Sequence, residues 1–205
     1  MITVAIVDDH SVVRMGLKYM LKLGNDLEPV AEGVCAQDAV DIANNVKPDV
    51  LLLDVRMPEV GGIEALKQIL AANPAQKVLM LTTSDMEEDI FQSIEAGAKG
   101  YVLKEANPEE LVAAIRTVAA GKTVFPDEIR RIYDMRKDEK TLSPREKEVL
   151  ESVSKGLSNN EIADLFGISH NSIKMHLKHI FEKLNVADRA EAVVTAIRRG
   201  IIEID

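Results

Sequence analysis

The stretch VLLLDVRMP, at residues 50–58, indicates the fold class of the first half of the chain. Its four consecutive apolar residues, Val50 to Leu53, are typical of a strand that is buried on both faces of a parallel sheet. Asp54 stands where this strand ends. We expect five such strands, because four more short apolar runs occur: Val4 to Val7, Leu27 to Ala31, Val78 to Leu81 and Tyr101 to Leu103.

Longer segments with apolar residues at helical spacing lie between and after these runs. They are Val12 to Leu23, Ala36 to Val46, Ile63 to Ala72, Asp89 to Ala96 and Pro108 to Ala119. Short strands that alternate with helices favour an α/β doubly wound fold with a five-stranded parallel sheet. We expect this domain at residues 1–121.

The sequence pattern changes after Gly121. The charge-dense stretch at residues 127–140 has no strong apolar stripe, so we expect a linker at 122–140 that is partly helical. Beyond it, four helix starts are marked by a capping residue: Ser143, Ser158, Ser169 and Asp188. Gly156, Gly167 and Gly200 stand where left-handed helix exits are needed. We therefore expect an all-α four-helix domain at residues 141–205.

The net charge of −9 is distributed unevenly along the chain. Residues 1–123 have a net charge of −8, whereas residues 140–205 have a net charge of zero. An acidic domain avoids phosphate backbones, so any nucleic-acid binding is expected in the second domain.

The sequence shows neither a signal-peptide pattern at its start nor an apolar run of the roughly 20 residues that span a bilayer. We therefore expect a cytoplasmic protein without membrane contact. The single cysteine, Cys35, cannot form an internal disulfide and is expected to be a small buried hydrophobe.

The residues at the predicted strand ends suggest one chemistry. Asp8 and Asp9 follow the first run, Asp54 the third, Thr82 the fourth and Lys104 the fifth. The carboxyl ends of parallel strands meet at one edge of a sheet, where three carboxylates would repel one another unless a cation neutralised them. Oxygen ligands and high charge favour Mg²⁺. We expect one aspartate to attack a phosphoryl donor there, while the ammonium and the hydroxyl stabilise the phosphoryl oxygens.

This half of the chain resembles the receiver domains of response regulators, specifically the NarL/FixJ type, which have a flavodoxin-like fold. The resemblance lies in DDH at 8–10, VRMGL at 13–17, LLDVRMP at 52–58 and YVLK at 101–104. It implies that Asp54 accepts the phosphoryl group, with Thr82 and Lys104 assisting. It also implies that Asp9, Asp54 and the backbone carbonyl of Arg56 hold Mg²⁺ and that Asp8 assists through water.

The same resemblance implies that Thr82 and Tyr101 form a switch. Phosphorylation would move the threonine toward the phosphoryl oxygen and turn the tyrosine inward. Without the resemblance, an aromatic at a strand edge is more often part of the core. Many receivers have proline after the lysine, but Glu105 stands here, so we do not expect a cis bond.

The second domain contains two short helices joined by a turn at Gly167, which is the pattern of a helix-turn-helix. The second of these helices has an apolar face and an opposite face with Asn171, Lys174, Met175 and Lys178. We expect the lysines, one turn apart, to enter a DNA major groove together, with phosphates contacted by His170, Ser172 and Lys183.

This region resembles the LuxR-type output domain in LSPRE at 142–146, GLSN at 156–159, EIA at 161–163 and IKMHL at 173–177. The resemblance implies base contacts by Lys174, Met175 and Lys178. It also implies dimerisation through the last helix, at residues such as Val193, Val194 and Ile197. The alternative is a protein-binding bundle with an ordinary solvated lysine face.

Together these features predict a phosphorylation-dependent transcriptional regulator. Its partners would be a sensor histidine kinase and promoter DNA, and it would form a homodimer on activation. We do not expect an enzyme, beyond Mg²⁺-dependent self-phosphorylation and slow dephosphorylation. A haloacid-dehalogenase-type phosphatase would need an acid at position 56, and a nucleotide-binding enzyme would need a glycine-rich loop after the first strand. A phosphorylation-independent regulator, whose receiver serves only for dimerisation, remains the main alternative.

Overall fold

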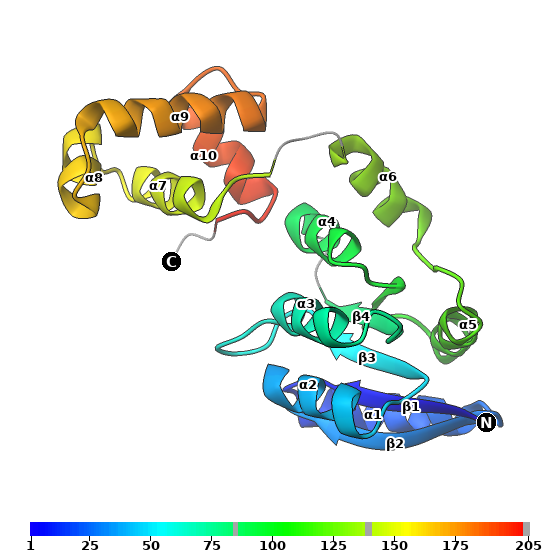
Figure 1. Ribbon diagram of the computed structural model, residues 1–205. Helices are drawn as coiled ribbons and strands as arrows, with labels where there is room; N and C mark the ends of the chain where they lie inside the picture. Colours follow the sequence, from blue (N-terminus) through cyan, green and yellow to red (C-terminus); the bar gives the residue numbers. More distant parts are fainter. Residues whose placement is uncertain (84–85, 138–140, 203–205) are drawn as a thin grey trace. The chain divides into compact units, whose positions relative to one another are not determined.

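The computed structural model describes residues 1–83, 86–137 and 141–202 (Figure 1). The chain divides into two compact units, Met1–Asp85 with Asp89–Tyr133, and Met86–Glu88 with Asp134–Asp205. Residues 138–140 of the predicted linker and 203–205 of the predicted second domain lie outside the described residues. Within the described ranges, no helix combines the length and the apolar character needed to cross a membrane.

The first unit contains an all-parallel five-stranded sheet, as predicted. Its strands are β1 (Ile2–Val7), β2 (Leu27–Gly33), β3 (Val50–Asp54), β4 (Val78–Thr82) and β5 (Gly100–Leu103). They are ordered β2-β1-β3-β4-β5, so the first and third strands lie side by side at the centre. The ends of these two strands bring the predicted aspartates together.

Helices cover both faces of the sheet, which makes the fold doubly wound. They are α1 (Ser11–Leu23), α2 (Ala36–Asn45), α3 (Gly62–Ala72), α4 (Glu87–Glu95) and α5 (Pro108–Ala119). Alternate strand residues separate into two buried clusters. Val4 and Ile6 pack with α1 and α5, whereas Ala5 and Val7 belong to the cluster that includes α2, α3 and α4. This alternation explains why each strand is apolar along its whole length.

The predicted linker contains a helix, α6 (Asp127–Arg136), that packs against the first unit. Ile129 is 4% exposed and belongs to the same buried cluster as Tyr101. The Tyr133 ring stacks on Phe91 of α4, and α6 runs beside α4 in Figure 1. A short apolar stripe is interleaved with the charges of α6 and packs this part of the predicted, partly helical linker against the first unit.

The second unit contains the four predicted helices, α7 (Pro144–Ser154), α8 (Asn159–Phe166), α9 (His170–Leu184) and α10 (Arg189–Arg198). The four predicted capping side chains each accept a backbone hydrogen bond, and at Ser143 and Ser158 the capping box is complete. Gly167 ends α8 with a φ of 64°, so the turn of the helix-turn-helix uses the left-handed conformation that favours glycine.

Cys35 differs from the prediction. It is only partly buried, because it occupies the N-cap position of α2 at the edge of the core.

Candidate functional site: an acidic pocket and a helix-turn-helix

The predicted pocket forms at the carboxyl edge of the sheet. Lys104, directly after β5, extends its ammonium between two aspartates: Lys104 Nζ lies 2.7 Å from Asp8 Oδ2 and 2.9 Å from Asp54 Oδ2. The Asp8 side chain is fully buried, and those of Asp54 and Lys104 are 3% and 9% exposed. Three residues that are far apart in the sequence thus form one buried ionic cluster.

The charges in the pocket are strongly coupled. Burial raises the pKa of the Asp54 carboxyl above its ordinary value; the Lys104 ammonium opposes this shift, and Asp8 adds to it. Burial alone would lower the pKa of the Lys104 amine, but hydrogen bonds to Asp8 and Asp54 outweigh it and raise that pKa. The ammonium therefore stays charged, and the cluster of carboxylates still has negative charge that a further cation would neutralise.

The donor set fits a divalent cation. Ligand atoms of Asp8, Asp9, His10 and Asp54 all lie within 4.8 Å of one another. Carboxylate oxygens at this density are the ligands that Mg²⁺ prefers. The sequence predicted the three aspartates, but His10 was not predicted, since it was quoted only as part of the DDH motif.

The loop after β3 is shaped around Asp54. The backbone N–H of Arg56 donates to Asp54 Oδ1 at 3.4 Å, and Arg56 Nε donates to Asp89 Oδ2 of α4 at 2.9 Å. A Cβ on Gly62 would lie 1.8 Å from the Asp54 carbonyl oxygen, a distance that no side chain tolerates. A glycine is therefore required where the chain returns past the aspartate. The predicted role of the Arg56 carbonyl as a metal ligand stays a prediction.

Thr82 and Tyr101, the predicted switch pair, lie deep in the domain. Thr82 is 1% exposed at the end of β4, and its carbonyl accepts a 2.7 Å hydrogen bond from the Lys104 backbone N–H. Tyr101 has no exposed surface, and burial raises the pKa of its phenol far above the usual range. The tyrosine thus occupies an inward position, in the buried cluster that also includes Ile129 of α6. Its movement stays a prediction.

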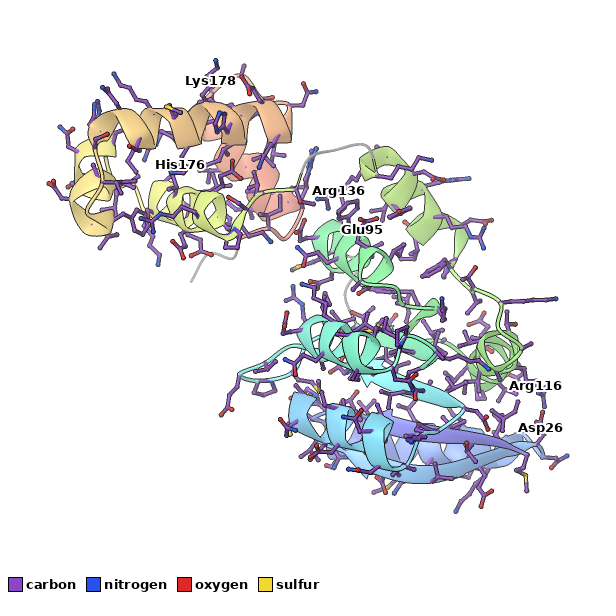
Figure 2. The ribbon with its side chains drawn as sticks, in the orientation of Figure 1. Asp26, Glu95, Arg116, Arg136, His176 and Lys178 are labelled. Atoms are coloured by element: carbon purple, nitrogen blue, oxygen red, sulfur yellow. The ribbon has the colours of Figure 1, made fainter. Side chains whose placement is uncertain are left out.

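The candidate DNA-binding face lies on α9. Ile173, Leu177 and Ile180 are buried in the domain core. Met175 is 61% exposed and the Lys178 side chain 74% exposed, and Lys174 is also exposed. Figure 2 shows Lys178 on the outer side of α9, whereas His176 lies toward α7. The helix therefore presents the predicted residues to solvent as one face.

Known proteins match both halves of this structure. Residues 4–116 match the response regulator receiver domain, and residues 140–196 match the bacterial regulatory proteins of the luxR family. The chain belongs to the NarL/FixJ-type response regulators. This two-component response regulator has a DNA-binding domain of the LuxR type and acts in transcription regulation, which argues against the two enzyme alternatives.

Relatives resemble the regulator over nearly its whole length. The uncharacterized transcriptional regulatory protein YxjL of Bacillus subtilis (strain 168) is 40% identical, over 98% of each chain. The nitrate/nitrite response regulator protein NarP of Escherichia coli (strain K12) is 36% identical, over 96% of this chain and 94% of NarP. The response regulator RcsB, solved in a complex with DNA, is similar with a TM-score of 0.68 and 26% identity, over 96% of this chain and 98% of that one.

Several residues of the regulator's second unit have partners that the sequence did not reveal. Lys183 was predicted to contact phosphates, but its ammonium lies 2.6 Å from Glu146 Oε2 and its side chain is only 21% exposed. The Ser172 hydroxyl and backbone N–H both bond Ser169 Oγ, within the α9 cap. His170 is exposed at the start of α9. The structure thus gives Lys183 an internal ion pair instead of a free ammonium.

The predicted dimerisation residues on α10 differ in exposure. Val194 is 65% exposed, whereas Val193 and Ile197 are partly buried against the domain's own core. Only Val194 of the three is presented as an open apolar side chain. A residue that sequence reasoning missed is Arg189, whose guanidinium donates to the Leu157 carbonyl and joins the start of α10 to the α7–α8 loop. No sequence motif marks this contact.

Proposed function

We propose that this response regulator accepts a phosphoryl group on Asp54 and that the resulting acyl phosphate controls its binding to promoter DNA. The observation that supports this most directly is the position of Lys104 Nζ between Asp8 and Asp54, at 2.7 and 2.9 Å. A buried aspartate beside an ammonium and two further carboxylates has the groups needed for a nucleophile in phosphoryl transfer.

The transfer is a substitution at phosphorus. A carboxylate oxygen of Asp54 forms the new P–O bond, and the bond from phosphorus to the donor's nitrogen or oxygen breaks, leaving its electron pair with the donor. The donor is a phosphohistidine of a sensor kinase or a small acyl phosphate. Lys104 is close enough to Asp54 to neutralise an oxygen of the incoming group, and the buried Thr82 hydroxyl is proposed to bind another.

Asp9 and Asp54, with the Arg56 carbonyl, are proposed to hold Mg²⁺, and Asp8 assists through water. When bound, Mg²⁺ neutralises charge that develops on the phosphoryl oxygens. The convergence of the aspartate oxygens within 4.8 Å supports this assignment. Slow loss of the phosphoryl group to water at the same site is the only hydrolysis that we expect.

A protein donor has a suitable docking surface next to the pocket. Helix α1 begins two residues after Asp9 and exposes Val12, Met15 and Tyr19 by 78%, 68% and 68%. These apolar side chains follow one another at helical spacing along one stripe. We propose that the sensor histidine kinase packs on this stripe while its phosphohistidine reaches Asp54.

The signal is proposed to leave the pocket through α4 and α6. Arg56 joins the loop after Asp54 to Asp89 of α4, and Tyr101 shares its buried cluster with Ile129 of α6. A phosphoryl dianion on Asp54 competes with Asp89 for the Arg56 guanidinium, and inward or outward positions of Tyr101 change the surface on which α6 rests. In the sequence, α6 leads on to the second unit. A phosphorylation-dependent change in how α6 packs on the first unit is therefore proposed to control DNA binding by the second unit.

DNA recognition is proposed for the outer face of α9, with Lys174, Met175 and Lys178 at base edges and His170 and Ser172 near phosphates. The exposure of these lysines supports the assignment. Two chains paired through α10, with Val194 as the open contact, would reach half-sites about one helical turn apart. DNA as the partner implies that the regulator works in the cytoplasm.

The test uses the full chain with Mg²⁺ and acetyl phosphate, followed by intact mass and DNA affinity. We expect the wild type to gain one phosphoryl group and to bind promoter DNA more tightly, and Asp54→Asn to do neither. Asp41→Asn, an exposed aspartate on α2, is the matched control and should behave as wild type. A phosphoryl group that persists in Asp54→Asn would refute the assigned acceptor. DNA affinity unchanged by phosphorylation would favour the phosphorylation-independent alternative.

A further inference from the structure

We propose that a hollow on the first unit, between β5, α5 and residues 124–126, binds a small organic cation with an apolar body. The hollow has a volume of about 660 Å³, which is a usual size for a site that binds a small molecule. Its lining includes neither Asp54 nor any residue of α9, so the inference does not depend on the proposed function.

The walls of the hollow are mainly apolar. Ala113, Ala114 and Thr117 line it from α5, where they follow one another at helical spacing. Leu103, which is 40% exposed, and the partly buried Phe125 line it from the other side. The short side chains of α5 leave room for the apolar body of a ligand, and an aromatic ring is a favourable neighbour for a cation.

One buried polar group of the lining has no hydrogen-bond donor. The Tyr101 backbone N–H donates to the Val124 carbonyl, and the Val124 N–H donates to the Lys99 carbonyl, both at 3.0 Å, so residue 124 pairs with the outer edge of β5. In a parallel ladder the Tyr101 carbonyl would next accept from residue 126, but Pro126 has no N–H.

This carbonyl is an acceptor that a ligand can use. Tyr101 has no exposed surface, and its carbonyl accepts no hydrogen bond from the residues that the structure describes. A buried acceptor without a donor costs free energy, which an N–H of a bound ligand would recover. The site therefore favours a ligand that donates hydrogen bonds, such as an ammonium.

The rim of the hollow is acidic. Among the described residues that line it, only Glu105 and Glu110 are charged, and both are exposed. Glu110 also accepts the Asn107 N–H within the α5 cap. The Arg130 side chain donates to the Phe125 carbonyl, but Arg130 is not a lining residue. Carboxylates at the rim and a carbonyl acceptor inside together favour a cation over a neutral or anionic ligand.

The experiment titrates the full chain with phenylbutylamine, phenylbutanol and phenylbutyrate, which share one apolar body and differ in charge. Heteronuclear NMR follows binding at the amide resonances of Leu103 and Ala113. We expect the amine to bind about tenfold more tightly than the alcohol, because charge-assisted hydrogen bonds are stronger than neutral ones, and the butyrate to bind most weakly. Equal affinities of the amine and the alcohol, or no shift at either amide, would overturn the inference.

Two pairs of variants locate the site. Ala113→Leu fills the hollow from an exposed helix position and should weaken amine binding about tenfold or more, whereas Ala71→Leu makes the same change at an exposed position of α3 and should bind as wild type. Glu110→Gln removes a rim charge but keeps an oxygen for the α5 cap. It should lower amine affinity about threefold and leave that of the alcohol unchanged.

Glu109→Gln, at a neighbouring glutamate outside the lining, is the control for the rim charge and should retain wild-type amine affinity. Amine affinity that is unchanged in Ala113→Leu would show that the cation binds elsewhere and would refute the assigned hollow. Phosphorylation of Asp54 and DNA affinity are measured separately, so their outcome leaves this test unaffected.

Discussion

The ring of Tyr133 on α6 stacks on the ring of Phe91 on α4, with centroids 5.8 Å apart and an interplanar angle of 28°. The Tyr133 hydroxyl also donates to Glu95 Oε1 at 2.8 Å. Glu95 is labelled at the end of α4 in Figure 2. Because Asp89 of the same helix is bonded to the loop after Asp54, α4 connects the acidic pocket to α6.

Replacing Tyr133 by alanine should weaken the coupling between phosphorylation and DNA binding. The substitution removes both the ring stacking with Phe91 and the hydrogen bond to Glu95, so α6 packs less tightly against α4 in either phosphorylation state. We expect the ratio of DNA affinities with and without acetyl phosphate to fall toward one, while phosphorylation of Asp54 continues. Met135→Ala, at an exposed position on α6 itself, is the control. An unchanged ratio in Tyr133→Ala would exclude α6 as the readout.

Replacing Gly62 by alanine should damage the pocket without touching a charged residue. The new Cβ would lie 1.8 Å from the Asp54 carbonyl oxygen, so the backbone of the acceptor must shift. We expect a loss of stability of about 1–3 kcal/mol, as for overpacking, and slower phosphorylation. Gly16→Ala is the control, since its Cβ would meet nothing within 4 Å, and it should be neutral or slightly stabilising. Urea denaturation and intact mass measure the two effects; equal behaviour of both variants would contradict the steric argument.

Lowering the pH should weaken the second unit through Glu146. Burial alone would raise the pKa of this carboxyl, but the Lys183 ammonium and the Ser143 cap outweigh it and lower that pKa below its ordinary value of 4.5. A carboxyl with a lowered pKa in the folded state stabilises the fold above its unfolded pKa, and this contribution is lost as the pH falls through the folded pKa. We therefore expect stability to fall as the pH drops below the ordinary value of 4.5.

Glu146→Gln tests this assignment by urea denaturation at neutral and acidic pH. Glutamine keeps a side-chain oxygen that can accept from the Ser143 N–H, so the substitution removes mainly the ion pair with Lys183. This loss should cost about 1 kcal/mol at neutral pH, and the pH dependence should become flatter. Glu148→Gln is the matched control, because Glu148 is half exposed and its pair with Arg145 is a surface pair. An identical pH dependence in wild type and Glu146→Gln would show that another group is responsible.

The sequence was sufficient to predict those structural features that a local pattern of residues determines. Buried strands read as continuous apolar runs, and helix starts such as Ser143 and Ser158 are marked by residues that satisfy free N–H groups. The pocket was predictable because the carboxyl ends of parallel strands meet at one edge, whatever the detailed packing. Its polar residues therefore converge from distant positions.

What the sequence did not reveal depends on contacts between elements. Docking of α6 needs only a short stripe around Ile129 and Tyr133, which the surrounding charges conceal. Lys183 has the composition of a phosphate ligand, yet the fold brings it to Glu146, 37 residues away. His10 was overlooked because proximity of its ring to the aspartates depends on the backbone path between β1 and α1.

The contrast between two lysines of α9 gives the last prediction. The Lys178 side chain is 74% exposed, and its ammonium forms a salt bridge with Glu182 at 3.7 Å, a surface pair that contributes little to stability. A base contact by Lys178 would be worth about 1–3 kcal/mol, so Lys178→Ala should weaken binding to the best DNA site about tenfold and relax its sequence preference.

Lys183→Ala should instead lower the stability of the second unit, because it leaves the buried Glu146 carboxylate without its ammonium, and should change DNA affinity much less. Fluorescence anisotropy with specific and scrambled duplexes, at two salt concentrations, measures the affinities. Lys155→Ala, at the exposed C-cap residue of α7, serves as control. A larger loss of DNA affinity in Lys183→Ala than in Lys178→Ala, with folding intact, would reverse the two assignments.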